Sequence, residues 1–369
     1  MRATVANKIR VLIDCGWILK PRGLGRYVKE LLNAVCECEV SGLEISALVP
    51  HGAQNIAKEC GVKRIYVAPS LAIPLWEQIL VPWVAMKTGV DVVHCPGNTK
   101  GLALDALGIR HVVTLHDVMF IDNKTHGLYQ LFGNLYRREI VKRMFSKRLH
   151  LITVSNASRA QIKEKFGVNA SVIYESVELL KEQLMIDGAY AEDNGHTGGP
   201  YFVHVGGEAP HKNSKLVVEA FRRADIKGFR LLLLGVSKDS AFAKEHADRT
   251  VIVPGWVSDA RVATYVSRAH AMVFPSLREG YGLPIVEAFA MGCPVITSNI
   301  APMNEIAGDA ALLVNPSSVV EISDALHAVA TNDSLRKKLT QAGRERLGVF
   351  SAKIMREKTI EIYRQAMLR

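Results

Sequence analysis

The sequence contains no Asp-X-Asp motif, no Cys-X-X-Cys pair and no uninterrupted apolar run long enough to cross a bilayer. Its six cysteines are scattered over 369 residues, without the paired spacing of a zinc ribbon or the density of a disulfide scaffold. The segment from Met1 to Asp14 lacks the apolar stretch and small-residue cleavage site of a secretory leader. We therefore expect a reducing, cytoplasmic location, no transmembrane helix and no metal dependence.

Low-complexity segments are also missing, and the composition is that of a globular protein. Hydrophobic residues make up 49% of the chain and charged residues 22%. The length exceeds twice the commonest domain size, so two domains are expected. The most apolar window, Leu71–Met86, is interrupted by Pro74 and Pro82.

Positive charge is in excess and is unevenly distributed. The formal net charge is +10. Residues 1–185 contain 24 Lys and Arg against 16 Asp and Glu, whereas the remaining residues contain 22 against 20. This bias favours an anionic partner for the first half: nucleic acid, a membrane surface or a phosphorylated ligand.

Short runs rich in Val, Ile and Leu alternate with longer segments of helical period, which predicts parallel sheets covered by helices. The polar, glycine-rich segment 186–200 interrupts this alternation and is the expected linker. The sequence thus predicts an α/β protein with two doubly wound domains, 1–185 and 201–350. In such sheets ligands bind beyond the carboxyl ends of the strands, so the active site is expected in an interdomain cleft. The expected strands are 9–14, 44–49, 64–68, 90–94, 111–116, 150–155, 201–205, 229–234, 251–253, 271–274, 294–297 and 311–314.

The most informative segment is Phe274–Gly292, which leaves an apolar strand and enters a helix through two glycines. Pro284 suits the first positions of that helix and Gly292 its C-terminal end. Glycines allow the backbone to approach a ligand, and the free amides of a helix start attract phosphate. Glu279 precedes the glycines and Glu287 lies about one turn inside the helix, so both can border one pocket. Taken alone, the two glutamates could equally be a solvated loop charge and a helix-end acid.

Three further loops follow predicted strands. In Val205–Asn213, the amides after Gly206 and Gly207 and the ammonium of Lys212 could neutralise a diphosphate. In Asp14–Tyr27, Gly23 and Gly25 form a strand-to-helix loop, although these glycines could merely turn the chain. The third loop carries His116, at the expected end of a strand, and Asp117, which could orient His116 or cap the next element.

The Glu-X7-Glu element and the following CPVITSNIAPMNEIAGDAALLVNP resemble the retaining glycosyltransferases of family 4, which have the GT-B fold, and the similarity extends over nearly the whole chain, with a mannosyltransferase-like character. The resemblance implies that Glu279 binds the donor sugar, that Glu287 holds the ribose, and that Gly280, Tyr281, Gly282 and Leu283 bind sugar and diphosphate. It adds Arg26 to Gly23 and Gly25 as donor-side residues, and it places His116 near the anomeric carbon. It also implies that the C-terminal helix, about 351–369, packs back on the first domain.

Two positions depart from the family pattern. His211 stands where an arginine usually precedes the lysine, so only the role of Lys212 carries over. Tyr174–Glu175–Ser176 replaces the usual Pro-Asn-Gly turn, which puts the local loop geometry in doubt but is expected to touch none of the assigned catalytic residues. The family's WEQILVP and VSNASRAQI segments are interpreted as scaffold, with Ser155 or Ser158 as a helix cap.

The segment Tyr136–His150 combines three basic pairs with an apolar face. Such a helix can lie on an anionic membrane. It can equally bury its apolar face in its own domain and leave its charges in solvent. The sequence leaves both interpretations open.

Together these features predict a transfer of a hexosyl group from a nucleoside diphosphate sugar, GDP-mannose or UDP-glucose, to a lipid-linked saccharide acceptor in polysaccharide or glycolipid synthesis. Glu279, His116 and Lys212 are the expected catalytic residues, with no cofactor and no nucleic-acid partner. A nicotinamide-dependent dehydrogenase is one alternative, because Gly23 and Gly25 begin the dinucleotide fingerprint, although Val28 occupies the third glycine position. A nucleic-acid-binding protein, suggested by charge alone, is the other.

Overall fold

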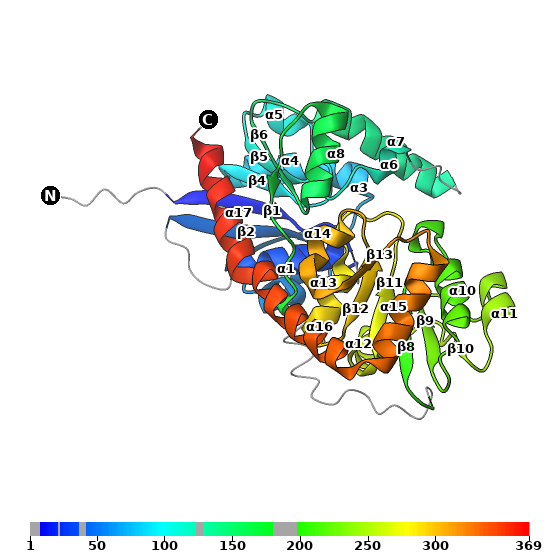
Figure 1. Cartoon of the computed structure of the whole chain (residues 1–369). Coiled ribbons are helices and arrows are strands. Elements are labelled where there is room, and N and C mark those ends of the chain that lie inside the picture. Colours follow the sequence, from blue (N-terminus) through cyan, green and yellow to red (C-terminus); the bar gives the residue numbers. More distant parts are fainter. Residues whose placement is uncertain (1–7, 21–22, 37–41, 123–127, 180–197, 369) are drawn as a thin grey trace. The chain divides into compact units, whose positions relative to one another are not determined.

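The structure is a computed structural model that describes residues 8–20, 23–36, 42–122, 128–179 and 198–368. The chain forms two compact units (Figure 1). The first comprises Met1–Ser176 and Ser351–Arg369, and the second comprises Val177–Phe350. The division therefore falls between Ser176 and Val177, earlier than the linker expected at 186–200, of which residues 186–197 lie outside the described residues.

The first unit is built on a seven-stranded parallel sheet with the order β3-β2-β1-β4-β5-β6-β7. Its strands are β1 (Ile9–Asp14), β2 (Leu43–Pro50), β3 (Arg64–Ala68), β4 (Val92–Cys95), β5 (Arg110–Thr114), β6 (Leu149–Thr153) and β7 (Ser171–Val172). Its helices are α1 (Leu24–Cys36), α2 (Gln54–Glu59), α3 (Ile73–Leu75), the π-helix η1 (Trp76–Leu80), α4 (Val81–Thr88), α5 (Ala103–Ala106), α6 (Met119–Asp122), α7 (Leu128–Arg143), α8 (Asn156–Phe166) and α17 (Ala352–Met367).

Helix α17 returns to the first unit, where it packs on α1 and on strands of the sheet. The contact includes a chain of buried hydrogen bonds. The Tyr363 hydroxyl lies 2.7 Å from His94 Nδ1, His94 Nε2 lies 2.9 Å from Thr114 Oγ1, and Thr114 Oγ1 lies 3.1 Å from the Tyr27 hydroxyl. Burial lowers the pKa of His94 to about 3, so this imidazole is neutral at pH 7. The last helix is thereby joined to α1, β4 and β5.

The second unit is built on a six-stranded parallel sheet with the order β10-β9-β8-β11-β12-β13. Its strands are β8 (Tyr201–Val205), β9 (Arg230–Leu234), β10 (Val251–Ile252), β11 (Ala271–Phe274), β12 (Val295–Ser298) and β13 (Leu312–Val314). Its helices are the 3₁₀ turn η2 (Pro210–Lys212), α10 (Ser214–Ala224), α11 (Ala241–His246), α12 (Asp259–Arg268), α13 (Leu283–Ala290), α14 (Met303–Ala307), η3 (Gly308–Ala310), α15 (Val319–Thr331), α16 (Asp333–Arg346) and η4 (Leu347–Phe350).

The expected doubly wound architecture is confirmed in both units. Four strands, β1, β3, β8 and β11, have the predicted bounds, because each is a short apolar run with a clear end. The two-residue strand β7 was not predicted, since it is too short to show a period. The predicted end of β5 at His116 is wrong: the strand ends at Thr114, and His116 lies in the following loop.

Helix α7 also ends earlier than the predicted basic helix, at Arg143. Ile140, Val141 and Met144 are buried, and the latter two belong to the core of the first unit. The apolar face of Tyr136–His150 therefore packs in its own domain. Of the two interpretations left open by the sequence, the structure supports this one.

Each sheet reverses its strand order at one point. In the first unit this point lies between β1 and β4, and in the second between β8 and β11. Loops that leave neighbouring parallel strands there diverge to opposite faces of the sheet, which opens a crevice at the carboxyl ends. Three of the loops singled out in the sequence follow β1, β8 and β11, at these points, and the fourth, with His116, follows β5.

Candidate active site

Close packing requires glycine at two positions of the loop after β8. Gly207 has φ +79°, and a Cβ on it would lie 2.9 Å from the carbonyl oxygen of Gly235. A Cβ on Gly206 would lie 2.2 Å from Nε2 of His204. Any larger residue at these positions would displace the loop. The backbone at Gly206 and Gly207 is thus held close to the sheet edge, where the sequence predicts a diphosphate.

His204 fixes this loop and was not predicted from the sequence. Its ring is fully buried, with Nδ1 donating to the Val273 carbonyl at 2.7 Å and Nε2 lying 2.9 Å from Ser214 Oγ. Ser214 Oγ in turn lies 2.6 Å from the Gly207 carbonyl oxygen. Burial lowers the pKa of His204 to about 4, so the ring is neutral at pH 7. It therefore joins β8, β11 and the start of α10 without placing a charge beneath the loops.

Lys212 and Glu279 meet at the point where this sheet reverses. Lys212 ends η2 after β8, and Glu279 lies in the loop after β11. Their Nζ and Oε1 atoms are 2.7 Å apart, and the two side chains are 23% and 14% exposed. Nζ also lies 5.3 Å from the centre of the Phe274 ring, a cation–π contact. The structure thus brings together two predicted catalytic residues separated by 67 positions.

The two loops are also tied through their backbones. The Leu277 amide donates to the His211 carbonyl at 2.8 Å, and Asn213 Nδ2 donates to the Pro275 carbonyl at 3.0 Å. Asn213 has φ +65°, a conformation that asparagine tolerates better than most residues. Burial lowers the pKa of His211, so this side chain adds no full charge at pH 7. Lys212 therefore remains the cation at the predicted diphosphate position.

Helix α13 begins as the sequence predicts. Gly282, at its N-cap, has φ +107°, and a proline occupies one of the first two helical positions. Gly280 and Leu283 are partly exposed, Tyr281 is 6% exposed, and Glu287 is partly buried on the fifth residue of the helix. Backbone amides at the start of α13 and the Glu279 carboxylate thus belong to one short loop. An anion or a polyol at this edge would meet both.

In the first unit, Gly23 and Gly25 shape the start of α1. Gly23 precedes the helix with φ +60°. A Cβ on Gly25 would lie 2.0 Å from the Lys20 carbonyl oxygen and 2.7 Å from that of Trp17, so the chain's own loop already covers this position. This packing alone accounts for Gly25. Arg26, partly buried on α1, follows it.

His116 is nearly buried, with both ring nitrogens facing protein acceptors. Nε2 lies 2.9 Å from the Pro96 carbonyl oxygen, which can only accept, so Nε2 carries a proton. Nδ1 lies 3.4 Å from Glu175 Oε1, and the ring packs edge-on against Tyr27 at 4.5 Å between centroids. The expectation that Tyr174–Glu175–Ser176 touches no assigned residue is therefore wrong. The departure from the family turn supplies the carboxylate that His116 faces.

Asp117 caps the next helix, which is one of the two roles that the sequence predicts for it. Its Oδ1 accepts from the Met119 amide at 2.8 Å, at the start of α6. Ser155, the other predicted cap, accepts from the Ser158 amide at the start of α8. This cap accounts for Asp117 without a contact to the His116 ring.

The WEQILVP segment, interpreted from the sequence as scaffold, contains a buried carboxylate. Glu77 is 1% exposed in η1 and accepts from Thr99 Oγ1 at 2.7 Å and from the Tyr136 hydroxyl at 2.7 Å. Burial raises its pKa to about 8. Its neighbour Trp76 donates from Nε1 to Asp14 Oδ1 at 2.6 Å, at the carboxyl end of β1. The π-helix therefore supports the loops after β1 and β4.

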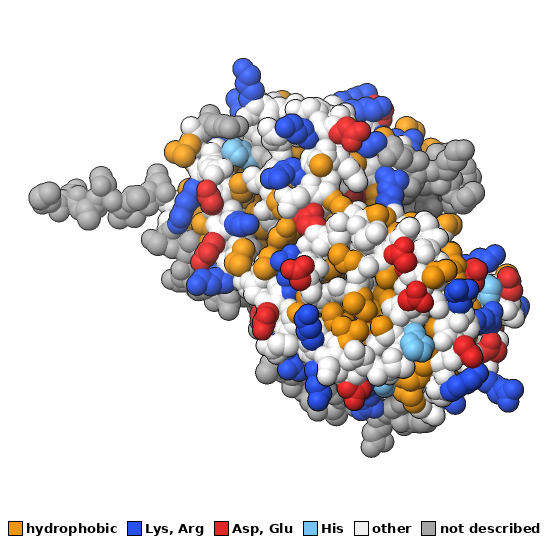
Figure 2. Space-filling model, viewed as in Figure 1, with side chains coloured by type: hydrophobic (Ala, Val, Ile, Leu, Met, Phe, Trp, Pro, Cys, Tyr) orange, Lys and Arg blue, Asp and Glu red, His pale blue; other side chains and the backbone are white. Residues whose placement is uncertain are grey.

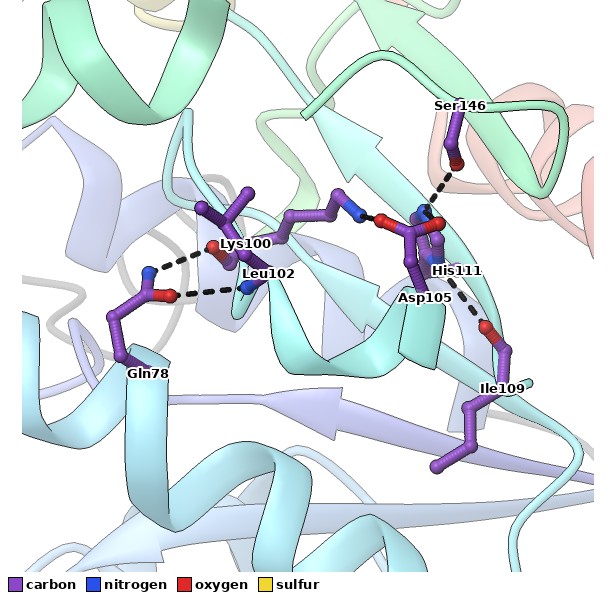
Figure 3. Close-up of polar contacts among 7 residues, drawn as sticks. All are labelled: Gln78, Lys100, Leu102, Asp105, Ile109, His111 and Ser146. Atoms are coloured by element: carbon purple, nitrogen blue, oxygen red, sulfur yellow. Dashed lines mark hydrogen bonds and ion pairs between the residues drawn. The ribbon is translucent and has the colours of Figure 1, made fainter. Parts of the chain in front are cut away.

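Figure 3 shows how the far end of the loop after β4 is held. Gln78 donates to the Lys100 carbonyl at 2.9 Å and accepts from the Leu102 amide at 3.0 Å. The buried Lys100 ammonium pairs with Asp105, which also lies 3.6 Å from His111 Nε2. The other end of this loop contacts His116 directly: the Pro96 carbonyl accepts from its Nε2, and Asn98 Oδ1 accepts from its backbone amide at 2.7 Å.

No three His, Cys, Asp or Glu side chains in the described part of the chain converge as metal ligands. No helix among those same ranges is both long and apolar enough to span a bilayer.

Residues 189–346 match the family model described as glycosyl transferases group 1, and residues 21–179 match the one described as glycosyltransferase family 4. The two matches are consecutive and follow the two units. The chain belongs to glycosyltransferase family 4. The resemblance deduced from the Glu-X7-Glu segment is thereby confirmed, and the dehydrogenase and nucleic-acid alternatives are not supported.

Two relatives of this glycosyltransferase illustrate the match. MJ1178 of Methanocaldococcus jannaschii, described as an uncharacterized glycosyltransferase, is 26% identical over 286 residues, which cover 74% of this chain and 73% of MJ1178. RfbU of Salmonella typhimurium, an O-antigen chain mannosyltransferase, is 29% identical over 222 residues, which cover 55% of this chain and 60% of RfbU. Both alignments leave part of each chain unmatched.

Among solved structures, HepE of Anabaena, determined in complex with UDP and glucose, aligns with the glycosyltransferase at a TM-score of 0.68. The alignment covers 97% of this chain and all of HepE, at 16% identity. At that identity the likeness establishes the fold, which is the predicted GT-B architecture. Roles for individual residues still depend on the contacts described above.

Proposed function

We propose that this glycosyltransferase is a retaining hexosyltransferase that moves a mannose- or glucose-type unit from a nucleoside diphosphate sugar to a lipid-linked saccharide acceptor. The observation that carries the proposal is the Lys212–Glu279 pair at the carboxyl edge of the second sheet. A cation beside a carboxylate at such an edge suits a ligand that joins a diphosphate to a polyol.

The donor would use each member of this pair differently. Lys212 would neutralise the diphosphate as negative charge develops on the departing oxygen, together with the backbone of Gly206 and Gly207. Glu279 would accept hydrogen bonds from sugar hydroxyls, since a carboxylate is a strong acceptor for O–H groups. Glu287 would hold the ribose, and the start of α13 would face the phosphates.

Donor binding must also break or rearrange the Lys212–Glu279 ion pair, because both groups would gain new partners. Their side chains are 23% and 14% exposed, so water already reaches the pair and the cost of exchange is modest. The pair therefore keeps both groups in place while the donor is absent.

The first unit would supply the acceptor side through His116 and Asp117, with Gly23, Gly25 and Arg26 approaching the donor. Within that unit His116 is already oriented by the Pro96 carbonyl and Glu175. Catalysis would rest on positioning and electrostatics, with the acceptor attacking from the face that the diphosphate leaves. We expect neither a metal nor a cofactor to take part.

The relatives support this class of substrates without deciding between them. RfbU is named for mannosyl transfer to an O-antigen chain, and the HepE structure contains UDP and glucose. GDP-mannose and UDP-glucose are therefore the first donors to test. The basic first half of the chain suits a phosphorylated, lipid-linked acceptor.

The test is ligand-detected NMR binding with a panel of nucleoside diphosphate sugars, which identifies base and sugar together. We expect Glu279→Ala to abolish transfer of the sugar that binds, while a control at the exposed Glu219, Glu219→Ala, keeps full activity. Full activity of a folded Glu279→Ala variant would refute the site. The absence of binding by any nucleotide sugar would refute the function.

A further inference from the structure

The surface of the first unit carries a row of exposed apolar side chains that the proposed chemistry does not use. Helices α3, η1 and α4 follow one another without a break from Ile73 to Thr88. Five large residues of this segment and of the loop just before it are 42–61% exposed. We call them the apolar ridge: Leu71, Leu75, Ile79, Trp83 and Met86.

Their spacing places these residues on one face. The four helical members of the ridge, from Leu75 to Met86, are three or four positions apart, which is about one turn of a helix, and Leu71 precedes them in the loop. The segment Leu71–Met86 has one charged residue, Glu77, and its side chain is buried beneath the ridge. At about 1.5 Å per residue the ridge is roughly 20 Å long. Single exposed leucines are ordinary, but a contiguous row without charge marks an interaction surface.

Positive charge lies on the helix beside the ridge. Helix α7 packs against η1, because the Tyr136 hydroxyl bonds Glu77 and Gln78 at 2.7 and 2.8 Å. The same helix exposes Phe132 and Leu135. In its last turn Lys142 and Arg143, with side chains 65% and 67% exposed, both pair with Glu139, so these three residues together carry one net positive charge. In Figure 2 the charged side chains seen over the first unit are mostly Lys and Arg, whereas those over the second are mixed.

We propose that the apolar ridge docks this glycosyltransferase on an anionic lipid bilayer, with the cationic end of α7 facing the headgroups. A projecting helical ridge of Trp, Leu, Ile and Met suits a fluid surface that can close around it. Adjacent Lys and Arg add attraction to anionic lipids. This interpretation replaces the buried apolar face of residues 136–150 as the membrane contact.

The inference deepens the proposed function and rests on it only for its purpose, which is to bring the enzyme to a lipid-linked acceptor. Vesicle binding can be measured without donor or acceptor. A failure of docking is therefore distinct from a failure to bind nucleotide sugars.

The experiment is flotation of the full chain with phosphatidylcholine vesicles, with and without phosphatidylglycerol. We expect binding to the anionic vesicles that weakens as salt increases. The double substitution Ile79→Ser with Trp83→Ser should weaken it by about a hundredfold, since each of the two lost apolar anchors is worth about a factor of ten. The matched control is Trp256→Ser, at a 75% exposed tryptophan of the second unit, which should bind like the wild type.

A second measurement keeps the ridge apolar by replacing tryptophan with phenylalanine, so it does not depend on how the double variant folds. Brominated phosphatidylglycerol should quench tryptophan fluorescence in the wild type and in Trp256→Phe, and should quench Trp83→Phe far less. Absence of vesicle binding by the wild type, or equal quenching in all three proteins, would overturn the proposal. A wild-type dimer that the double substitution converts to a monomer would instead make the ridge an interface between copies of this chain.

Discussion

Substitution of Glu77 by glutamine should change how the stability of this glycosyltransferase depends on pH. Glu77 is buried in η1 and accepts hydrogen bonds from Thr99 and Tyr136. Burial raises its pKa from 4.5 to about 8, so the folded protein holds a proton at pH 7 that the unfolded chain has released. Glutamine has the same shape as the protonated acid and keeps an acceptor oxygen, but it cannot ionise.

The sign follows from proton linkage. A carboxyl with a raised pKa contributes stability at low pH, and this contribution is lost as pH rises from the unfolded to the folded pKa, here from 4.5 to about 8. At 1.36 kcal/mol per unit, the whole window is worth about 5 kcal/mol, and the portion between pH 5 and 8 about 3 kcal/mol. Glu77→Gln cannot ionise, so its unfolding free energy does not decrease for this reason as pH rises.

Urea denaturation of wild type and Glu77→Gln at several pH values between 5 and 8 measures the effect. We expect the unfolding free energy of Glu77→Gln, relative to that of the wild type, to increase by about 3 kcal/mol from pH 5 to pH 8. Taking the difference removes the titration of other groups, and Glu219→Gln, at an exposed glutamate, provides the matched control. Parallel curves for the wild type and Glu77→Gln would show that Glu77 ionises normally and would refute the reasoning.

Three further outcomes can be checked on single variants. Lys212→Met should lower the transfer rate by roughly a hundredfold, because it removes the cation beside the leaving diphosphate, and an unchanged kcat would contradict that role. Glu175→Ala should lower transfer about tenfold more than Glu175→Gln, which can still hydrogen-bond His116 Nδ1; equal activities of both variants and wild type would deny Glu175 a positioning role. Gly207→Ala should lower the unfolding free energy by about 1–3 kcal/mol in urea denaturation, and by more than Gly228→Ala. Both glycines have φ near +80°, but a Cβ at Gly228 meets nothing within 4 Å, so equal losses would exclude the predicted clash with Gly235.

The sequence by itself determined the architecture, because the signals for it are local. Apolar runs of β1, β3, β8 and β11 end sharply at turn residues, and strands alternating with helices leave a doubly wound sheet as the natural arrangement. The start of α13 was equally readable, since Gly282 and Pro284 act through their own backbones. The Glu-X7-Glu segment also predicted the family correctly.

Tertiary structure decided the features that depend on residues distant in sequence. The Lys212–Glu279 pair joins two loops that become neighbours only because β8 and β11 pair in the sheet. Glu175 and His116 are 59 positions apart and likewise meet only because the sheet brings their loops together. The contact could not be predicted from the sequence, which shows only that the loop with Glu175 departs from the family pattern.

Burial was the other property that only the fold could assign. Amphipathic spacing shows that a helix has an apolar face, but the same spacing serves a core contact and an exposed surface. In the segment 136–150 that face lies in the core, whereas Leu75, Ile79 and Trp83, in the most apolar window of the chain, are half exposed. Glu77, between them in sequence, is buried, and this burial raises its pKa to about 8 although the hydrogen bonds from Thr99 and Tyr136 act in the opposite direction.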